Sequence, residues 1–144
     1  MMGYVRQTGA LAAVAGRTAW DQETMMPRGA AEQRAEEMAA LEAVLHARRT
    51  DPRIGEWLEK AEARDVNSAA QLREIKRDYE RNTKVPERLA TELARVTSRA
   101  QGIWAGARAT EDVAAFLPVL EQVVRLRREE AACLAGDGDL YDAL

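Results

Sequence analysis

Apolar side chains recur along this chain every three or four residues, the spacing of one face of an α-helix. One such stripe comprises Ala31, Ala35, Met38 and Leu45. The longest stripe comprises Leu89, Leu93, Val96, Ala100, Ile103 and Ala107. These patterns predict helices at about 8–24, 31–48, 52–63, 68–82, 86–107 and 118–135. No segment alternates apolar and polar residues as a half-buried strand does. The expected fold is therefore an all-α bundle of about six helices.

The breaks between these helices coincide with residues that start or stop helices. A proline pushes the residue before it out of the α region, so Pro27 and Pro86 mark boundaries. Asp51 and Pro52 predict a helix start, since an Asp side chain accepts a backbone N–H and proline fits the first turn. The run Ser-Ala-Ala-Gln at 68–71 matches a capping box, and 65–67 and 110–112 resemble loops. Residues 1–144 contain no repeat or linker, so we expect a single domain.

Composition excludes several classes of protein. The chain is 47% hydrophobic, which is too apolar for general disorder, and no uninterrupted apolar stretch approaches the ~20 residues of a membrane span. The net charge of -3 argues against a nucleic-acid-binding protein, for which a clustered basic surface would be expected. The N-terminus lacks the basic-then-apolar order of a secretory signal. We therefore expect a cytoplasmic protein whose partners include neither nucleic acid nor a membrane.

The chain has a single histidine, His46, and a single cysteine, Cys133. A zinc site needs three or four His, Cys or carboxylate ligands, and no His-Glu-x-x-His motif is present. We expect His46 to interact with the negative end of its helix. Cys133 is expected to be a small packed residue, because no local signature makes it a catalytic nucleophile.

Carboxylates are numerous, but none forms a convincing acid–base pair. Asp21 and Glu23 are two positions apart and would point to different sides of a helix. Two pairs, Lys76–Glu80 and Glu121–Arg125, have the i,i+4 spacing of ion pairs on a solvated helix face. The motif formed by Gly102 and Gly106 is interpreted as a place where a neighbouring helix approaches closely.

Several short stretches combine rare Trp, Pro and Tyr residues at fixed spacing. The first is Trp20-Asp21-Gln22-Glu23-Thr24-Met25-Met26-Pro27, followed by Gly29, Ala31, Glu32 and Arg34. The next are Thr50-Asp51-Pro52, Ile54-Gly55, Arg77-Asp78-Tyr79-Glu80-Arg81 and Thr83-Lys84-Val85-Pro86. The last are Ser98, Ala100, Trp104, Ala107-Arg108, Asp112, Phe116, Pro118, Leu120 and Tyr141-Asp142-Ala143-Leu144. From about residue 10 to 144 the chain resembles the carboxypeptidase Taq family of metallocarboxypeptidases.

This resemblance implies the fold of the family's N-terminal helical part, which covers one side of a peptidase cleft. Family members are much longer, and their His-Glu-x-x-His helix, which holds zinc or another divalent metal, lies beyond the matched part. No catalytic, cofactor-binding or metal-binding residue of this chain is therefore predicted. We expect a truncated or stand-alone relative that does not release C-terminal amino acids from peptides by itself and contains no cofactor.

Two alternatives remain beside that interpretation. One is a helical interaction module, and the other is an enzyme that uses carboxylates alone. Absence of the catalytic segment would uncover apolar surface on the last helix, where Val119, Leu120, Val123, Val124 and Leu126 span a wide arc, and at Trp104. Because large exposed apolar patches mark interfaces, we expect a homo-oligomer, specifically an isologous dimer, with the missing catalytic segment as the other candidate partner.

Overall fold

The computed structural model describes residues 1–143, which form six α-helices and one short 3₁₀ turn. The elements in chain order are α1 (Met2–Thr24), η1 (Arg28–Ala30), α2 (Ala31–Arg49), α3 (Pro52–Glu59), α4 (Val66–Lys84), α5 (Glu87–Thr110) and α6 (Val113–Ala135). No strand occurs in this described range, so the all-α prediction is confirmed. None of the described helices is both long and apolar enough to cross a membrane.

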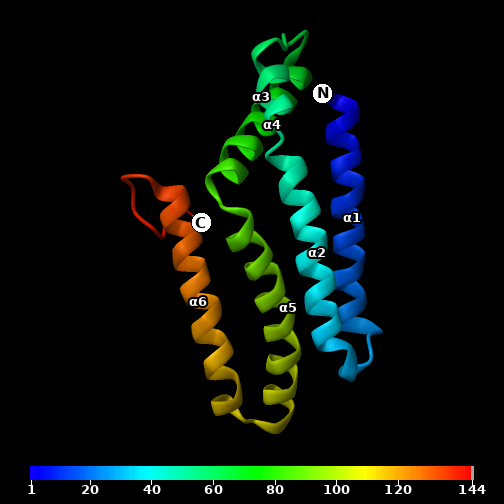
Figure 1. The fold of residues 1–144 in the computed structure, drawn as a ribbon, viewed down its shortest axis with the longest axis vertical. Helices are drawn as coiled ribbons and strands as arrows, with labels where there is room; N and C mark the ends of the chain where they lie inside the picture. Colours follow the sequence, from blue (N-terminus) through cyan, green and yellow to red (C-terminus); the bar gives the residue numbers. More distant parts are fainter. Residues whose placement is uncertain (144) are drawn as a thin grey trace.

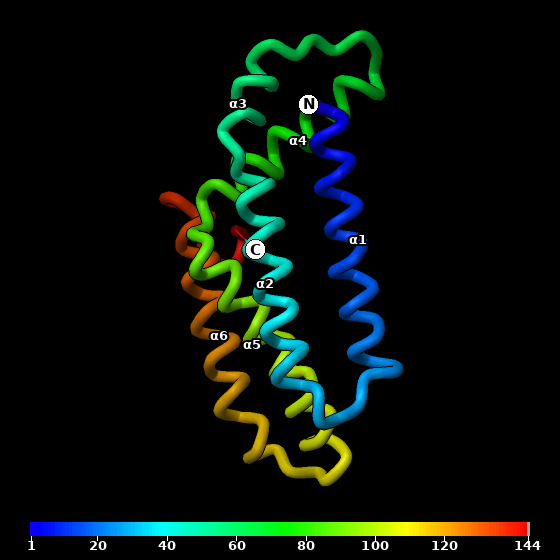
Figure 2. Tube along the Cα trace, turned by 45° about the vertical axis from the view of Figure 1, so that its right-hand side comes forward, coloured from blue at the N-terminus to red at the C-terminus, as the bar shows by residue number. Residues whose placement is uncertain are grey.

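The long helices lie side by side in an open row rather than around a closed centre. Figures 1 and 2 show the order α1, α2, α5, α6 across the molecule, with α3 and α4 at one end. The most extensive contacts between helices are those of α2 with α5 and of α5 with α6, followed by those of α1 with α2. This arrangement makes α5 the central helix and leaves α6 at an edge, where much of its surface faces solvent.

The apolar core lies along α5, mainly against α6. Leu89, Val96 and Leu126 are the largest fully buried side chains. Val85, Leu93, Ala100 and Val119 complete the buried cluster. The stripe predicted on α5 is therefore the core of the molecule, because its helical spacing places all its members toward the neighbouring helices.

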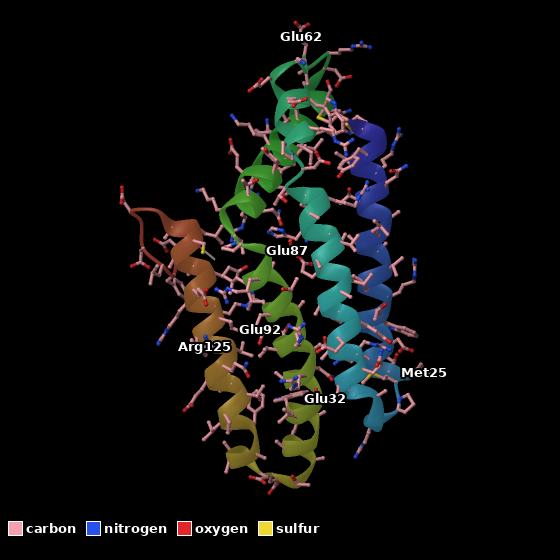
Figure 3. All side chains as sticks on the ribbon, viewed as in Figure 1. Met25, Glu32, Glu62, Glu87, Glu92 and Arg125 are labelled. Atoms are coloured by element: carbon pink, nitrogen blue, oxygen red, sulfur yellow. The ribbon has the colours of Figure 1, made fainter. Side chains whose placement is uncertain are left out.

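The contact between α2 and α5 is built from small side chains with ion pairs beside it. Ala35 and Ala39 are buried at 0% and 3% exposure. Arg95 Nε lies 2.8 Å from Glu36 Oε1, and Arg99 Nη2 lies 3.1 Å from Glu32 Oε2. Figure 3 labels Glu32 on α2 and Glu92, a second partner of Arg95, on α5. Small residues in the middle and paired charges outside let the two helices approach closely.

The prediction for the two glycines of α5 holds at one of them. A Cβ at Gly102 would lie 3.5 Å from the Ala31 Cβ, so α2 does approach α5 there, although at ordinary van der Waals distance. At Gly106 no atom lies within 4 Å of such a Cβ. The close-approach interpretation is therefore wrong for Gly106, because α2 begins at Ala31, opposite Gly102, and α5 continues past that point (Figure 1).

The predicted start at Asp51–Pro52 is confirmed and is reinforced by tertiary contacts. Asp51 Oδ1 accepts the Arg53 backbone N–H at 3.0 Å, and Tyr4 Oη donates to Asp51 Oδ2 at 3.0 Å. The Arg53 guanidinium also pairs with Asp51, with Nη2 2.6 Å from Oδ2. These hydrogen bonds to the carboxylate, chiefly those from Arg53, hold the pKa of Asp51 well below its usual range.

We predict that Asp51→Asn lowers the thermal midpoint at pH 7 and that this difference shrinks as the pH falls. A carboxylate whose pKa is depressed by folding stabilises the protein above its unfolded pKa of about 3.9, and the contribution is lost as the pH falls toward the folded value. Thermal unfolding by circular dichroism between pH 2 and pH 7 (roughly spanning that window) measures it. Asp78→Asn is the matched control, since Asp78 forms no ion pair within the described residues. A difference independent of pH would contradict the assignment.

Three predicted helix starts are wrong. Each of these helices begins earlier than predicted, because side-chain contacts cap or extend it before the predicted first residue. The first helix begins at Met2 rather than near Thr8. Its extra turns are held by Arg48, whose Nε donates to Thr8 Oγ1 at 3.0 Å and whose guanidinium lies 4.1 Å from the Tyr4 ring centroid. Arg48 lies on α2, 40 residues after Thr8 in the sequence.

The capping box of α4 exists, but it lies three residues before the predicted one. Asp65 is the N-cap: its Oδ1 accepts the Ser68 N–H at 2.7 Å, and the Ser68 hydroxyl accepts the Asp65 N–H at 3.0 Å. Residues 66 and 67 are therefore helical rather than part of a loop. An Asp accepts backbone hydrogen bonds at an N-cap as well as Ser does, which explains the error.

The last helix begins at Val113 instead of near Pro118. Asp112 caps it, since its side chain accepts the Ala115 N–H at 3.1 Å. Pro118 therefore lies inside α6, where its missing N–H leaves one backbone bond unmade. The break at 110–112 is confirmed: Glu111 adopts a left-handed conformation with φ 57° between α5 and α6.

Candidate functional site

The signature stretch at 20–34 connects the end of α1 with the start of α2, and Arg34 is its central side chain. Arg34 Nη2 lies 2.5 Å from Asp21 Oδ2, and Arg34 Nη1 donates to the Thr18 carbonyl at 2.5 Å. Its Nε donates to Glu37 Oε2 at 3.0 Å. The hydrogen bond to Asp21 is the main reason that the pKa of Arg34 is raised. Arg34 thus fixes the angle between two helices through a short turn.

A second polar contact of the signature reaches across to α5. Gln22 Nε2 donates to the Ser98 carbonyl at 2.7 Å, and the Ser98 hydroxyl donates to Gln22 Oε1 at 2.9 Å. Ser98 is one of two buried polar residues in the described range, at 7% exposure. Because both partners are satisfied, this pair holds α1 against the central helix without leaving a buried polar atom unpaired.

The apolar members of the signature behave differently from its polar members. Trp20 is 64% exposed and Met25 is 71% exposed. Figure 3 shows Met25 at the outer side of the end of α1. Three polar side chains of the signature, Asp21, Gln22 and Arg34, therefore link helices, while two of its large apolar side chains lie on the surface.

Sequence reasoning missed these partners. Asp21 and Arg34 are 13 positions apart, and Gln22 and Ser98 are 76 apart. The sequence contains one indication that these residues matter, which is that all four belong to the stretches that carry the family resemblance. Asp21 and Glu23, which were not expected to converge, lie apart in the structure: Glu23 is exposed, and Asp21 pairs with Arg34.

A cleft of about 290 Å³ lies where α2, α4, α5 and α6 meet. Its charged lining residues are Glu42, Arg49, Arg81, Arg127 and Glu130. Arg49 Nη1 pairs with Glu42 Oε1 at 3.0 Å, and Arg127 Nη1 pairs with Glu130 Oε2 at 2.7 Å. Arg81 donates to the Ala143 carbonyl at 2.9 Å. Two arginines of the cleft are therefore paired with its two glutamates, and the third arginine, Arg81, bonds to a backbone carbonyl.

His46 lies in the wall of this cleft at 7% exposure. Its Nε2 is 2.7 Å from the Val85 carbonyl oxygen, which can only accept, so Nε2 carries the proton of this bond. His46 is in the last turn of α2, as its predicted interaction with that helix end required. Its observed role is to tie α2 to the junction between α4 and α5.

The described residues bring no nucleophile or metal ligands together around His46. Its hydrogen-bond partner is a backbone carbonyl, and Cys133 is half-buried against the apolar core. No group of three or more His, Cys, Asp or Glu side chains in residues 1–143 is arranged to hold a metal ion. The geometry of both the signature and the cleft is that of a scaffold that fixes helices.

The sequence of this chain matches a family of known proteins. Residues 1–144 match the carboxypeptidase Taq (M32) metallopeptidase family. Thermostable carboxypeptidase 1 of Thermus thermophilus is 44% identical over 100% of this chain and 31% of its own length. Carboxypeptidase 1 of Bacillus subtilis is 29% identical over 87% of this chain and 26% of its own length.

The fold has also been seen in a solved structure. A crystal structure named BsuCP superposes with a TM-score of 0.89 at 24% identity, covering 99% of this chain and 29% of that one. The chain thus spans 31% or less of the length of these relatives. Of the motif residues that suggested the resemblance, Leu144 alone lies outside the described part. The resemblance is confirmed over the full sequence, and the chain belongs to the carboxypeptidase Taq (M32) metallopeptidase family.

Proposed function

We propose that this chain is a helical scaffold of an M32 carboxypeptidase, corresponding to the part that covers one side of the peptidase cleft, and that by itself it releases no amino acids from peptides. The proposal rests on the hydrogen bonds and ion pairs that three signature side chains, together with Ser98 on α5, make within the helical bundle. Asp21, Gln22, Arg34 and Ser98 are engaged with one another and with helix backbone. Side chains held in this way position helices and are not free to act on a substrate.

The metal that the family name implies does not fit the residues of this chain. Zinc takes at least three protein ligands in a catalytic site. The one histidine is bonded to the Val85 carbonyl, and the described carboxylates form no group with it. The described residues therefore support no catalytic step through a metal. The cytoplasmic location stays a prediction.

The first test measures metal content and activity of the purified chain. We expect zinc well below one atom per chain by elemental analysis and no release of C-terminal amino acids from a peptide mixture. Carboxypeptidase 1 of Bacillus subtilis, assayed alongside, controls for substrate and conditions. Stoichiometric zinc together with peptide trimming that a chelator abolishes would overturn the proposal.

The second test asks whether the chain performs the scaffold role in a relative. Its sequence replaces the matching segment of thermostable carboxypeptidase 1 from Thermus thermophilus, which is 44% identical. We expect the chimera to keep its metal and its peptidase activity. The same chimera carrying Gln22→Leu should keep metal content but lose thermal stability, because Ser98 is then left unpaired. A chimera that folds yet has no activity would speak against the scaffold role.

A further inference from the structure

An open pocket lies between the end of α5 and the start of α6, at the end of the molecule opposite α3 (Figure 1). Its volume is about 540 Å³, within the range of roughly 300–1,000 Å³ that is usual for small-molecule sites. Its walls include the rings of Trp104 and Phe116 and the side chain of Val113. Trp104 is 45% exposed and Val113 is 67% exposed. The pocket therefore offers an apolar, partly aromatic surface to a small molecule.

Two side chains of opposite charge complete the lining of this pocket. The Arg108 guanidinium lies 5.6 Å from the centroid of the Trp104 ring, a cation–π distance. Glu111 also lines the pocket, and neither Arg108 nor Glu111 forms an ion pair within residues 1–143. The pair predicted between Glu121 and Arg125 on α6 is likewise not formed. The pocket thus contains one cation and one anion, neither of which joins two helices.

The backbone of Glu111 has a conformation that glycine adopts more readily. Its φ of 57° is the one positive φ of a non-glycine residue in the described range. The Asp112 N–H donates to the Ala107 carbonyl at 2.8 Å, a hydrogen bond typical of a helix end whose left-handed residue is usually glycine. A side chain at such a position lowers stability, and unfavourable dihedral angles cluster at binding sites. The glutamate therefore points to a use for its carboxylate outside the fold.

The chemistry of the lining selects one class of small molecule. A guanidinium binds a carboxylate, a carboxylate accepts hydrogen bonds from an ammonium group, and aromatic side chains bury an apolar group. A free apolar α-amino acid carries all three of these groups on one carbon atom. Because Arg108 and Glu111 are three positions apart, such a zwitterion pairs with both of them. A ligand with a single charge would meet one like charge.

We propose that this pocket binds a free α-amino acid with an aromatic or branched apolar side chain. The ligand carboxylate pairs with Arg108, its ammonium group pairs with Glu111, and its side chain packs against Trp104, Val113 and Phe116. The inference does not rest on the proposed function, because the pocket residues take no part in the contacts that support the scaffold role.

Nuclear magnetic resonance of the purified chain measures binding through the indole N–H signals, and Trp104→Phe identifies the signal of Trp104. L-Phenylalanine should shift this signal with a dissociation constant of about 1 mM, a typical strength for so small a ligand in an open site. The signal of Trp20 is the internal control, since Trp20 is 64% exposed and does not line the pocket. Glycine has no apolar side chain and should bind about tenfold more weakly.

Ligands that lack one charge test the two ion pairs separately. N-acetyl-L-phenylalanine has no ammonium group and L-phenylalaninamide has no carboxylate, so each should bind about tenfold more weakly than L-phenylalanine. Glu111→Gln should weaken L-phenylalanine by the same factor without weakening the acetylated ligand. Arg108→Gln should remove the difference between L-phenylalanine and its amide. Arg17→Gln is the matched control, because Arg17 is an exposed arginine on α1 without an ion pair among the described residues.

The variant Glu111→Gly separates ligand binding from folding. Glycine adopts a positive φ without strain, so the thermal midpoint should rise by about 3 °C. Loss of the carboxylate should at the same time weaken L-phenylalanine binding about tenfold. A residue that served the fold alone would not lose ligand binding while the fold becomes more stable.

Any of three results would show the inference to be wrong. The first is a Trp104 signal that does not move up to about 20 mM L-phenylalanine, well above the expected dissociation constant. The second is equal affinity for L-phenylalanine and its two singly charged derivatives, which would leave apolar contact as the whole of the binding. The third is undiminished binding of L-phenylalanine by Glu111→Gln. None of these results changes the expected zinc content or peptide release, so the inference and the proposed function fail separately.

Discussion

Leu89→Ala is expected to lower the free energy of unfolding by about 3 kcal/mol, within the range of roughly 2–5 kcal/mol for a buried leucine. Leu89 is 0% exposed on the central helix, in the cluster that joins α5 and α6. Removing its isobutyl group deletes apolar contacts and leaves a cavity that the row of helices cannot close, because each long helix is held by the next.

Urea unfolding followed by circular dichroism measures this effect. Leu140→Ala is the control, because Leu140 is 48% exposed and should change stability by less than about 0.5 kcal/mol. Leu89→Val, expected to cost about 1 kcal/mol, keeps the test informative if the alanine variant does not fold. Equal effects of Leu89→Ala and Leu140→Ala would contradict the position of the core.

Arg34→Met is expected to lower the free energy of unfolding by about 2 kcal/mol, since hydrogen bonds to charged groups contribute roughly 1.5–3 kcal/mol. The Arg34 side chain is 12% exposed and joins Asp21, Glu37 and the Thr18 carbonyl. Asp21 is 42% exposed, so solvent screens the pair and the effect should lie in the lower part of that range.

A double-mutant cycle with Asp21→Asn separates the pair from the other contacts of Arg34. We expect a coupling energy of about 1 kcal/mol between the two substitutions. Arg28→Met is the matched control, because Arg28 is exposed in the same turn and forms no ion pair among the described residues. A coupling energy near zero would mean that the contact between Arg34 and Asp21 does not hold α1 against α2.

The elements of this fold were predictable because local sequence carries strong signals. The stripe from Leu89 to Ala107 identifies α5 and its buried face, and the breaks at Pro27, Asp51, Pro86 and Gly136 are confirmed. The predicted start of α4 was wrong because either Asp65 or Ser68 could be the N-cap residue. The predicted start of α1 was wrong because a distant side chain, Arg48, holds additional turns of that helix. Propensity alone does not describe such contacts.

The roles of the signature residues depended on tertiary structure. From the sequence, Asp21 and Glu23 were weighed as a pair with each other, but the partner of Asp21 is Arg34 and the partner of Gln22 is Ser98. His46 was expected to interact with its own helix end, whereas its hydrogen bond goes to Val85 on another segment. Hydrogen bonds between residues far apart in sequence form only after the helices are placed, so no local pattern indicates them.

The sequence by itself determined the helical class, the approximate helices, the family and the buried face of α5, because helical periodicity, capping residues and rare motif residues are local properties. Only the tertiary structure decided the order α1, α2, α5, α6, the contacts by which the signature residues link helices, and the exposure of apolar side chains such as Leu117 and Val124 on α6. An amphipathic pattern states which side of a helix avoids water, but which neighbour covers that side, or whether any does, follows from the packing of whole helices.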